Sequence, residues 1–331
     1  MHMQSQAIVF REANRPRLEP FTLPMEGPAD VTVEIHYSGI SAGTETSIIS
    51  GARTHNGTFP LVSGYMAAGR ILSKGCEVKH LSIGDRVISW GSRLESANPV
   101  WGAHVAHHIC ASTSVTRVPD SVNLQAAASW IPPRVGLHAV EVAAISGNDI
   151  VLVSGLGVIG FFFAQWARLK GARVVALEPD SKRSEIARRQ AGISVIDPTQ
   201  GPLEDNVLAA CGGEWPTVVV EATGNKALIP QSMRFLKRTG RRIVFLSWYP
   251  GEIHLEYAQL HNHEVTAFFP TGAGTDETGR TVLAALADKT LNMNEPFLEV
   301  YPLHQAEQLF MRVSQGDRTL MSPVIDWKSA R

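Results

Sequence analysis

The stretch Asp149-Ile-Val-Leu-Val-Ser-Gly-Leu-Gly-Val-Ile-Gly160 decides the fold of this chain. It begins as a short, continuous apolar run, which is typical of a strand buried on both faces of a parallel sheet. Three glycines spaced G-x-G-x-x-G follow, and a segment of helix length comes after them. In this context the first glycine permits a tight turn, the second lets a pyrophosphate approach, and the third lets the helix pack on the strand. The pattern predicts a dinucleotide site at the positive end of the helix, formed by Gly155, Gly157, Val158, Ile159 and Gly160.

The sequence around this stretch alternates between strands and helices. Apolar runs at 172–177, 217–220 and 242–246 predict further buried strands, and the charged segment 181–190 predicts a helix. This alternation predicts a doubly wound parallel sheet. The 18 uncharged residues at 150–167 approach the length of a membrane-spanning helix, but their patterned glycines and β-branched start favour a strand, a turn and a helix.

The rest of the chain has a different texture. Residues 31–37 alternate apolar and polar side chains, and Gly and Pro recur between short apolar runs up to about residue 120, a pattern of an antiparallel, barrel-like domain. Residues 124–146 have a helical pattern that two prolines interrupt. Near the C-terminus, 301–313 predicts an amphipathic helix and 322–327 a closing strand.

Composition excludes several classes of protein. The 331 residues are 44% apolar and 18% charged, which is enough apolar material for large cores. Thirty basic and 31 acidic residues leave a net charge of −1, without the basic excess of a nucleic-acid or membrane-surface protein. Three cysteines are too few for a disulfide framework or a four-cysteine zinc lobe. Because the charge is balanced, we expect no nucleic-acid or membrane partner. Because the N-terminus does not have the pattern of a signal peptide, we expect a cytoplasmic protein.

The end of the second predicted strand indicates which dinucleotide binds. Glu178 stands there, 18 residues after Gly160. A carboxylate at this place accepts hydrogen bonds from the ribose hydroxyls and repels a 2′-phosphate, so NAD is favoured and NADP is the alternative. Lys182 and Arg183 follow and could attract that phosphate, or they could form a solvated helix face.

Together these features resemble the medium-chain dehydrogenase/reductase superfamily, alcohol dehydrogenase type, over essentially the whole chain. The resemblance rests on the glycine turn, Gly39-Ile-Ser-Ala-Gly-Thr-Glu45, Gly64-Tyr-Met-Ala-Ala-Gly69, Gly84-Asp-Arg-Val87 and Glu221-Ala-Thr-Gly224. It implies an α/β protein in which a Rossmann domain with a doubly wound parallel sheet is inserted into a GroES-like, β-rich catalytic domain. The domains expected are 1–123 and 266–331, the two parts of the catalytic domain, and 124–265, the NAD(P)-binding domain. It also implies an active site in the cleft between the domains and a homodimer or homotetramer.

The predicted cofactor site extends beyond the glycine turn. A core strand ends at Glu221-Ala-Thr-Gly224, at the sheet edge where open α/β folds bind ligands. In the superfamily, the residues after the next strand face the nicotinamide, and the backbone of a later segment holds its carboxamide. The additional cofactor residues expected are Ala222, Thr223, Gly224, Ser247, Trp248, Ala267 and Phe269.

Zinc members of the superfamily carry a cysteine in the first motif, His-Glu after the glycine of the second, and often a cysteine on the helix entering the cofactor domain. The corresponding positions here are Ser41, Tyr65-Met66, and Pro132 or its neighbours. None of these is a good zinc ligand, because zinc takes Cys, His or carboxylate and a catalytic site uses three of them. We therefore expect no zinc.

A second group of metal-ligating residue types lies at 101–110. In a strand, His104, His108 and Cys110 would share a face, and His107 lies beside them. A metal site is one interpretation. Ordinary histidines of a strand, away from the usual zinc position, are the favoured one, because side-chain type alone is weak evidence.

Two motifs narrow the resemblance. Ser38-Gly-Ile-Ser-Ala-Gly-Thr-Glu45 and Gly64-Tyr65 are similar to the branch that contains bacteriochlorophyllide a dehydrogenase, which oxidises a hydroxyethyl side chain to acetyl. Met66 stands where that branch usually has an acidic residue. The resemblance implies NAD(P)-dependent hydride transfer between nicotinamide and a secondary alcohol or ketone. The substrate that we expect is a small molecule, larger than a simple alcohol, in the biosynthesis of a specialised metabolite.

Without zinc, a side chain must protonate or hydrogen-bond the carbonyl oxygen as it becomes an alkoxide. Tyr65 is the first candidate, because its phenol would project into the position that the metal takes in zinc members; alternatively it only fills that space. Thr44 is the second, since superfamily members use a hydroxyl near this position to relay a proton toward the cofactor ribose. Ser41 and Glu45 are weaker candidates.

Two other functions remain open at this point. One is an NADPH-dependent enoyl or quinone reductase, against which Glu178 and the segment Ser41-Ala-Gly-Thr-Glu45 argue. The other is a non-catalytic cofactor-binding protein, which the loss of the metal ligands motivates.

Overall fold

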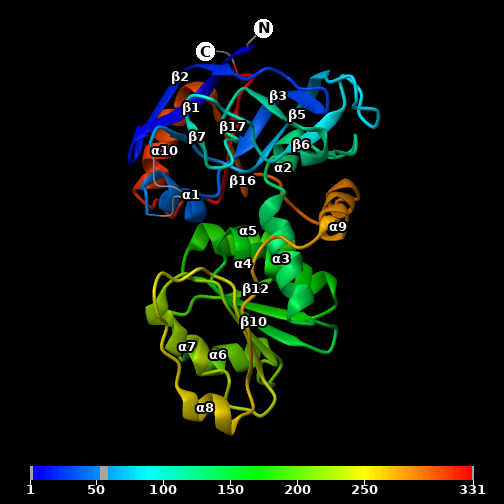
Figure 1. The fold of residues 1–331 in the computed structure, drawn as a ribbon. Coiled ribbons are helices and arrows are strands. Elements are labelled where there is room, and N and C mark those ends of the chain that lie inside the picture. Colours follow the sequence, from blue (N-terminus) through cyan, green and yellow to red (C-terminus); the bar gives the residue numbers. More distant parts are fainter. Residues whose placement is uncertain (1–2, 53–58, 330–331) are drawn as a thin grey trace. The chain divides into compact units, whose positions relative to one another are not determined.

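The computed structural model describes residues 3–52 and 59–329, which form two compact units (Figure 1). The first unit contains the described residues within Met1–Trp130, Leu286–Asp288 and Met293–Arg331. The second contains Ile131–Ala285 and Lys289–Asn292. Across the two described ranges, no helix is both long and apolar enough to cross a membrane.

The second unit is built on a six-stranded parallel sheet. Its strands are β10 (Ile150–Ser154), β11 (Arg173–Leu177), β12 (Ser194–Ile196), β13 (Val218–Glu221), β14 (Arg242–Phe245) and β15 (Thr266–Phe268). Its helices are α3 (Ile131–Val142), α4 (Val158–Leu169), α5 (Ser181–Ala191), α6 (Leu203–Ala210), α7 (Ile229–Met233), α8 (Tyr257–Asn262) and α9 (Asp276–Ala287), which begins in this unit.

The strand order of this sheet is β12-β11-β10-β13-β14-β15. The chain starts at the centre, builds outward on one side and then on the other, which is the order of a doubly wound dinucleotide-binding sheet. All five residues of β10 are buried, as its unbroken apolar sequence predicts. The uncharged stretch 150–167 is thus divided between β10, the glycine turn and α4.

The first unit contains both ends of the chain. Its strands are β1 (Met3–Glu12), β2 (Arg15–Leu23), β3 (Asp30–Gly39), β4 (Leu61–Val62), β5 (Ala67–Lys74), β6 (Arg86–Ser89), β7 (Asn98–Pro99), β8 (His107–Ala111), β9 (Val115–Arg117), β16 (Leu298–Pro302) and β17 (Ser322–Asp326). Its helices are α1 (Ala42–Ile49), α2 (Leu124–Ala127) and α10 (Ala306–Ser314).

Two sheets make up this unit. One has the order β2-β1-β4-β7, and the other β16-β17-β3-β5-β6-β9, with β8 also paired to β3. The C-terminal strand β17 pairs antiparallel with β3, Val324 opposite Gly39, so the last part of the chain completes a sheet that the first part begins. The predicted fold class, a doubly wound parallel sheet inserted into a β-rich domain, is confirmed.

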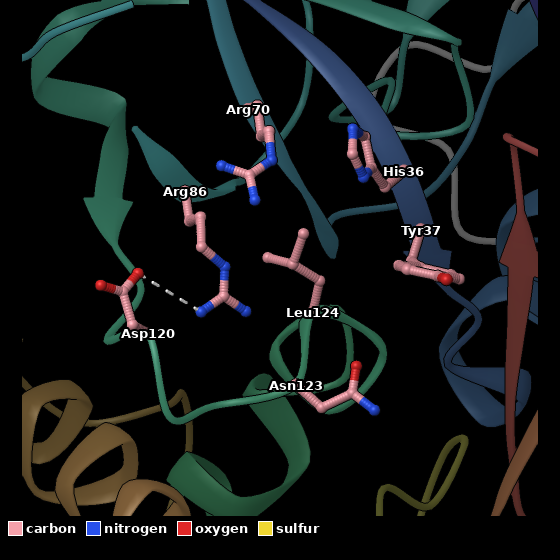
Figure 2. Close-up of a pocket in the computed structure, with 7 residues that line it drawn as sticks. All are labelled: His36, Tyr37, Arg70, Arg86, Asp120, Asn123 and Leu124. Carbon is pink, nitrogen blue, oxygen red and sulfur yellow. Dashed lines mark ion pairs between the residues drawn. The ribbon is translucent and has the colours of Figure 1, made fainter. Parts of the chain in front are cut away.

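The first unit extends seven residues beyond the domain end expected at residue 123. Figure 2 shows Arg86 beside the segment that leads into α2, at a pocket of about 400 Å³. Its guanidinium donates to the carbonyl oxygens of Pro119, at 2.8 Å, and Val122. The hydroxyls of Ser129 and Ser322 lie 3.0 Å apart and hydrogen-bond the end of this segment to β17. These contacts join residues 119–130 to the first unit.

The second boundary also differs from the expected one, at residue 265. Strand β15 pairs with β14, and Arg134 of α3 donates to the carbonyl oxygens of Ala273, at 3.0 Å, and Thr275, at 2.9 Å. Residues 266–285 therefore belong to the second unit.

Two predicted helices differ in extent. The helical pattern at 124–146 becomes α2 and α3, with Pro132 and Pro133 in the first turn of α3, where a proline's missing N–H costs nothing. The helix predicted at 301–313 starts only at Ala306, because Leu298–Pro302 pairs with β17 as the strand β16.

Candidate active site

The glycine turn joins β10 to α4 as the sequence predicts. Gly155 has φ +93°, a backbone conformation that favours glycine, and its N–H donates to the carbonyl oxygen of Leu177 at 2.9 Å. A Cβ on Gly160 would lie 2.1 Å from the Gly155 oxygen, whereas one on Gly157 would meet nothing within 4 Å. The turn therefore needs glycine at 155 and 160 for its own packing. At Gly157 the lack of a side chain leaves open space.

That open space lies at the start of α4. Gly157 is the N-cap and has no side chain to cap the helix, and the first turn contains Val158, Ile159 and Gly160. The N–H groups of a first helical turn have no acceptor within the helix, so they can bind an anion. These residues fit the pyrophosphate of a dinucleotide cofactor.

Glu178 follows β11 and contacts the same turn. Its side chain is 4% exposed, and its carboxylate accepts from the backbone N–H of Leu156 at 2.8 Å and of Asp180 at 3.0 Å. Two of the roughly four lone-pair positions of the carboxylate are thus used by the backbone. Lys182 and Arg183 lie in the first turn of α5, beyond the N-cap Asp180.

The end of β13 is organised by the buried carboxylate of Glu221, which begins the motif Glu221–Gly224 but is not among the site residues predicted from the sequence. Glu221 is 0% exposed and accepts from the Thr223 N–H at 2.9 Å, the Ser232 hydroxyl at 2.7 Å and the Tyr249 hydroxyl at 3.1 Å. Burial, and next the Glu221 carboxylate, raise the pKa of Tyr249, so this phenol remains a donor. Glu221 thereby connects the predicted segment Ala222–Gly224 to the loop after β14.

The other predicted cofactor residues lie after β14 and in or after β15. Ser247 is half-buried, and Ala267 is an exposed residue of β15. Trp248 and Phe269 are exposed by 63% and 60%, and the Phe269 ring stacks on Phe245 with centroids 5.1 Å apart. Two large apolar side chains thus stand exposed in the segments predicted to face the nicotinamide.

The predicted catalytic residues lie together in the first unit. Ser41 is the N-cap of α1, which contains Thr44 and Glu45, and Tyr65 follows β4. The Tyr65 hydroxyl donates to Thr44 Oγ1 in a long hydrogen bond of 3.5 Å, and both residues are half-buried. The Tyr65 ring also makes an edge contact with Trp101, at 5.1 Å between centroids.

Glu45 differs from the other three, because it is fully buried beside His104. His104 Nε2 lies 3.0 Å from Glu45 Oε2, and His104 Nδ1 lies 2.9 Å from the Ser38 hydroxyl. Glu45 also accepts from the Ser63 hydroxyl at 2.7 Å and the Ser41 N–H at 3.2 Å. From the sequence, His104 is predicted only as a strand histidine or a metal ligand. The signal in the sequence was Glu45 itself: an acidic residue in a motif that lacks metal ligands needs another polar partner, which here is His104.

The positions that hold zinc in relatives of this fold do not fit a zinc ion. Ser41 uses its backbone N–H on Glu45, Tyr65 offers a phenol, Met66 is 1% exposed, and Pro132 has no donor atom. Within residues 3–52 and 59–329, no group of three or more His, Cys, Asp or Glu is placed to hold a metal. The chemistry of this donor set does not match the Cys, His and carboxylate ligands of zinc.

The histidine-rich segment is used internally. His108 Nδ1 lies 2.8 Å from the Ser89 hydroxyl and His108 Nε2 2.9 Å from the Ala103 carbonyl oxygen, and burial lowers the pKa of His108 to about 4. Burial raises the pKa of the Cys110 thiol to about 11. His104 lies before β8 rather than in it. The interpretation as ordinary structural residues is therefore the one that the contacts favour.

Comparison with known proteins agrees with this architecture. Residues 27–120 match the alcohol dehydrogenase GroES-like domain, and residues 158–291 match the zinc-binding dehydrogenase family. L-galactonate-5-dehydrogenase of Escherichia coli is 25% identical, over 92% of this chain and 93% of the relative. Sorbitol dehydrogenase of Gallus gallus is 26% identical, over 95% and 94%.

Solved structures share the fold over nearly the whole chain. An oxidoreductase/dehydrogenase of unknown specificity from Escherichia coli has a TM-score of 0.85 at 17% identity, covering 98% of this chain and 99% of that one. A putative zinc-binding dehydrogenase from Sinorhizobium meliloti bound to NADP has a TM-score of 0.82 at 20% identity, with the same coverage. A short chain alcohol dehydrogenase from E. coli CFT073 complexed with NADH has a TM-score of 0.82 at 18% identity, again covering 98% of this chain and 99% of that one.

The fold, the glycine turn and the matched families define an NAD(P)-dependent oxidoreductase. The chain belongs to the medium-chain dehydrogenase/reductase superfamily, alcohol dehydrogenase type.

Proposed function

We propose that this protein is a zinc-independent, NAD-dependent dehydrogenase that interconverts a secondary alcohol and a ketone. The observation that carries the proposal is the half-buried pair of Tyr65 and Thr44, whose hydroxyl oxygens lie 3.5 Å apart where relatives of this type hold a metal. An acid or hydrogen-bond donor is what this chemistry needs in place of a Lewis acid.

When bound, the nicotinamide supplies or accepts the hydride. The protein has to hold the substrate oxygen and supply or take its proton. In our proposal the Tyr65 oxygen takes the proton of the substrate hydroxyl during alcohol oxidation, while the hydrogen that Tyr65 donates to Thr44 Oγ1 moves onto that oxygen; reduction reverses both transfers. Catalytic hydrogen bonds are often long before substrate binds, so 3.5 Å is compatible with this role. Thr44 accepts from Tyr65 and relays the proton onward.

The two remaining candidates take lesser roles. Glu45 is 0% exposed and all its contacts are internal, so we assign it no contact with substrate. Ser41 stands at the N-cap position of α1, and its backbone N–H donates to Glu45. The two residues thus lie on either side of Thr44 along the chain, joined by this hydrogen bond.

NAD rather than NADP is the cofactor that we propose. The Glu178 carboxylate lies against the glycine turn through the Leu156 N–H, where it would repel a 2′-phosphate. Lys182 and Arg183 in α5 act in the opposite direction. Structures of similar fold have been solved with NADP and with NADH, so the fold accommodates both and the local charges decide.

Secondary alcohols and polyols are the substrate class that we propose first. Relatives named sorbitol dehydrogenase and L-galactonate-5-dehydrogenase support alcohol oxidation. A larger biosynthetic substrate, a homodimer or homotetramer, and a cytoplasmic location remain predictions from the sequence.

A turnover assay with purified protein tests the proposal. NADH oxidation is followed with ketones and enones, and NAD reduction with secondary alcohols and polyols, each repeated with the phosphorylated cofactor. We expect turnover with alcohol–ketone pairs. Turnover confined to enones and NADPH would replace the proposal with an enoyl or quinone reductase. Cofactor binding without turnover of any substrate would support a non-catalytic binding protein.

A further inference from the structure

The buried contacts around Glu45 form a directed chain of hydrogen bonds. Trp327 Nε1, which can only donate, lies 2.8 Å from the Ser38 hydroxyl oxygen. Ser38 can then donate to His104 Nδ1 at 2.9 Å, and a hydrogen on His104 Nε2 faces Glu45 at 3.0 Å and 3.1 Å. Each of these polar groups has a hydrogen-bond partner in this arrangement.

This chain ends beside both members of the proposed catalytic pair. Glu45 directly follows Thr44 in α1 and accepts from Ser63, two residues before Tyr65. The backbone N–H of His104 donates to the Ser63 carbonyl oxygen at 3.2 Å, so His104 contacts this segment through its main chain as well. One carboxylate and one imidazole thus connect helix α1 to the segment that carries Tyr65.

Gly64 shows how tightly His104 is packed. Its φ is +94°, and a Cβ at this position would lie 2.5 Å from His104 Cδ2 and Nε2. The imidazole also contacts Phe310 edge-on, with centroids 5.1 Å apart. Because any side chain at position 64 would clash with the imidazole, the positions of His104 and Gly64 depend on each other, and Tyr65 is the next residue.

We propose that His104 is the positioning residue of the Tyr65–Thr44 pair. Through Glu45 it holds the first turn of α1, and through Gly64 and Ser63 it holds the segment leading to Tyr65. The cluster does by buried hydrogen bonds what a bound metal does in zinc relatives: it brings two segments distant in sequence to one place. This inference rests on the proposed function for its kinetic consequence, but its geometric claim is testable without any substrate.

The geometric claim is tested by nuclear magnetic resonance of tyrosine labelled at Cζ. The chain has five tyrosines, and the Tyr65 signal is the one absent from Tyr65→Phe. His104→Phe keeps the ring and its contact with Phe310 but removes the hydrogen bonds to Glu45 and Ser38. We expect the Tyr65 signal to shift or broaden, while that of Tyr257, which is 74% exposed, stays in place.

His107→Phe is the matched control, because it makes the same chemical change three residues away. His107 Nδ1 contacts the Ser5 hydroxyl, at 3.1 Å, and not Glu45. If His104→Phe fails to fold, Ser63→Ala removes one donor to Glu45 and should move the same signal. A Tyr65 signal unchanged in a folded His104→Phe or Ser63→Ala protein overturns the proposal.

A double-mutant cycle tests the kinetic consequence with the best alcohol or ketone from the turnover assay. His104→Phe should lower kcat by roughly 10- to 100-fold, the scale for a misplaced catalytic group, with NADH affinity unchanged within about twofold. In the Tyr65→Phe background the same substitution should lower kcat no further. Equal losses in both backgrounds overturn the positioning role while Tyr65 keeps its own. Wild-type turnover of Tyr65→Phe removes the catalytic role of Tyr65 and, with it, this inference.

Discussion

The carboxylate of Glu178 accepts a hydrogen bond from the backbone N–H of Leu156 at 2.8 Å. The residue that follows β11 is thereby joined to the middle of the glycine turn after β10. A negative charge at this point is held in place by the backbone, in a side chain only 4% exposed. Discrimination between the two dinucleotides should therefore depend on this carboxylate more than on Lys182 and Arg183 of α5.

The first prediction concerns this carboxylate. The unaltered protein should bind NADH at least roughly tenfold more tightly than NADPH, and Glu178→Gln should reduce that ratio, because it removes the charge and keeps the size of the side chain. Dissociation constants from nicotinamide fluorescence at fixed salt measure the ratio. Lys182→Ala and Arg183→Ala are the controls and should weaken NADPH binding only. Preference of the unaltered protein for NADPH contradicts the prediction.

The second prediction separates the roles of two glycines. Gly160→Ala places a Cβ 2.1 Å from a backbone oxygen, so we expect the free energy of unfolding to fall by about 1–3 kcal/mol. Gly157→Ala meets nothing within 4 Å, at a position with φ −60°, so stability should fall by less, about 0.5–1 kcal/mol, the difference between glycine and alanine at an N-cap.

NADH affinity should show the opposite order, with the larger loss in Gly157→Ala. A methyl group at 157 would stand where we expect the pyrophosphate to approach, so NADH affinity should fall roughly tenfold or more. Urea unfolding and NADH titration of both variants measure the two quantities. Full NADH affinity in Gly157→Ala would show that the cofactor does not approach the turn here.

The third prediction is that catalysis requires no zinc. Ser41, Tyr65 and Met66 do not match the ligands that zinc takes, so the purified, active protein should contain far less than one zinc per chain. A chelator should leave turnover unchanged. Elemental analysis and turnover on the same sample make the comparison. Stoichiometric zinc, together with activity lost to the chelator and restored by zinc, would refute the expectation.

Short-range patterns explain which parts of the fold could be predicted from the sequence. The β10 strand, the glycine turn and α4 depend on apolar periodicity and on the size of three neighbouring residues, and they lie where predicted. The strand β16 was missed because it depends on pairing with β17, some 24 residues later in the chain, while its own sequence continues into a helical pattern. The extent of α3 was misjudged because two prolines indicate an interruption, although a first turn accepts them.

The candidate site divides in the same way. The cofactor residues that we propose follow strand ends, and strand ends can be located from local sequence. The partnership of Glu45 and His104 joins positions 59 residues apart, and it depends on how two segments are placed in three dimensions. Glu221 and Tyr249, 28 residues apart, are a second case. Side-chain pairs of this kind have no periodic signature in the sequence.

The fourth prediction is a pH dependence of stability. His108 is fully buried, and burial lowers its pKa from 6.5 to about 4. Between these values the unfolded chain binds a proton that the folded chain does not, so the folded state loses stability as the pH falls from 6.5 toward 4. This contribution should amount to about 2 kcal/mol between pH 7 and pH 5.

His108→Gln isolates that contribution, because glutamine cannot take up a proton but can still donate and accept hydrogen bonds. Urea unfolding at pH 7 and pH 5 should show a smaller difference in this variant than in the unaltered protein. His36 and His107, whose pKa values burial also lowers, remain in both proteins and cancel in the comparison. Replacing the exposed His254 by Gln should leave the difference as it was. An equal difference with and without His108 contradicts the assignment.

The last prediction concerns the proton donor. Tyr65→Phe keeps the ring and its edge contact with Trp101 and removes only the hydroxyl, so the fold and NADH affinity should barely change. If that hydroxyl donates to the substrate oxygen, kcat and kcat/KM should fall together by roughly 10²-fold or more. Thr44→Ala should reduce kcat less, because a relay that is lost can be replaced by water, whereas the donor cannot.

The competing interpretation, in which Tyr65 only fills space, makes the opposite forecast. Phenylalanine fills that space almost equally well, so turnover of a folded Tyr65→Phe protein would stay near that of the unaltered one. Steady-state kinetics with the same alcohol–ketone pair in both directions distinguish the two. A loss that appears in KM alone would mean that the hydroxyl binds ground state and transition state equally and does not serve as the acid. Thr44, which lies 3.5 Å from the Tyr65 hydroxyl, would then become the leading proton source.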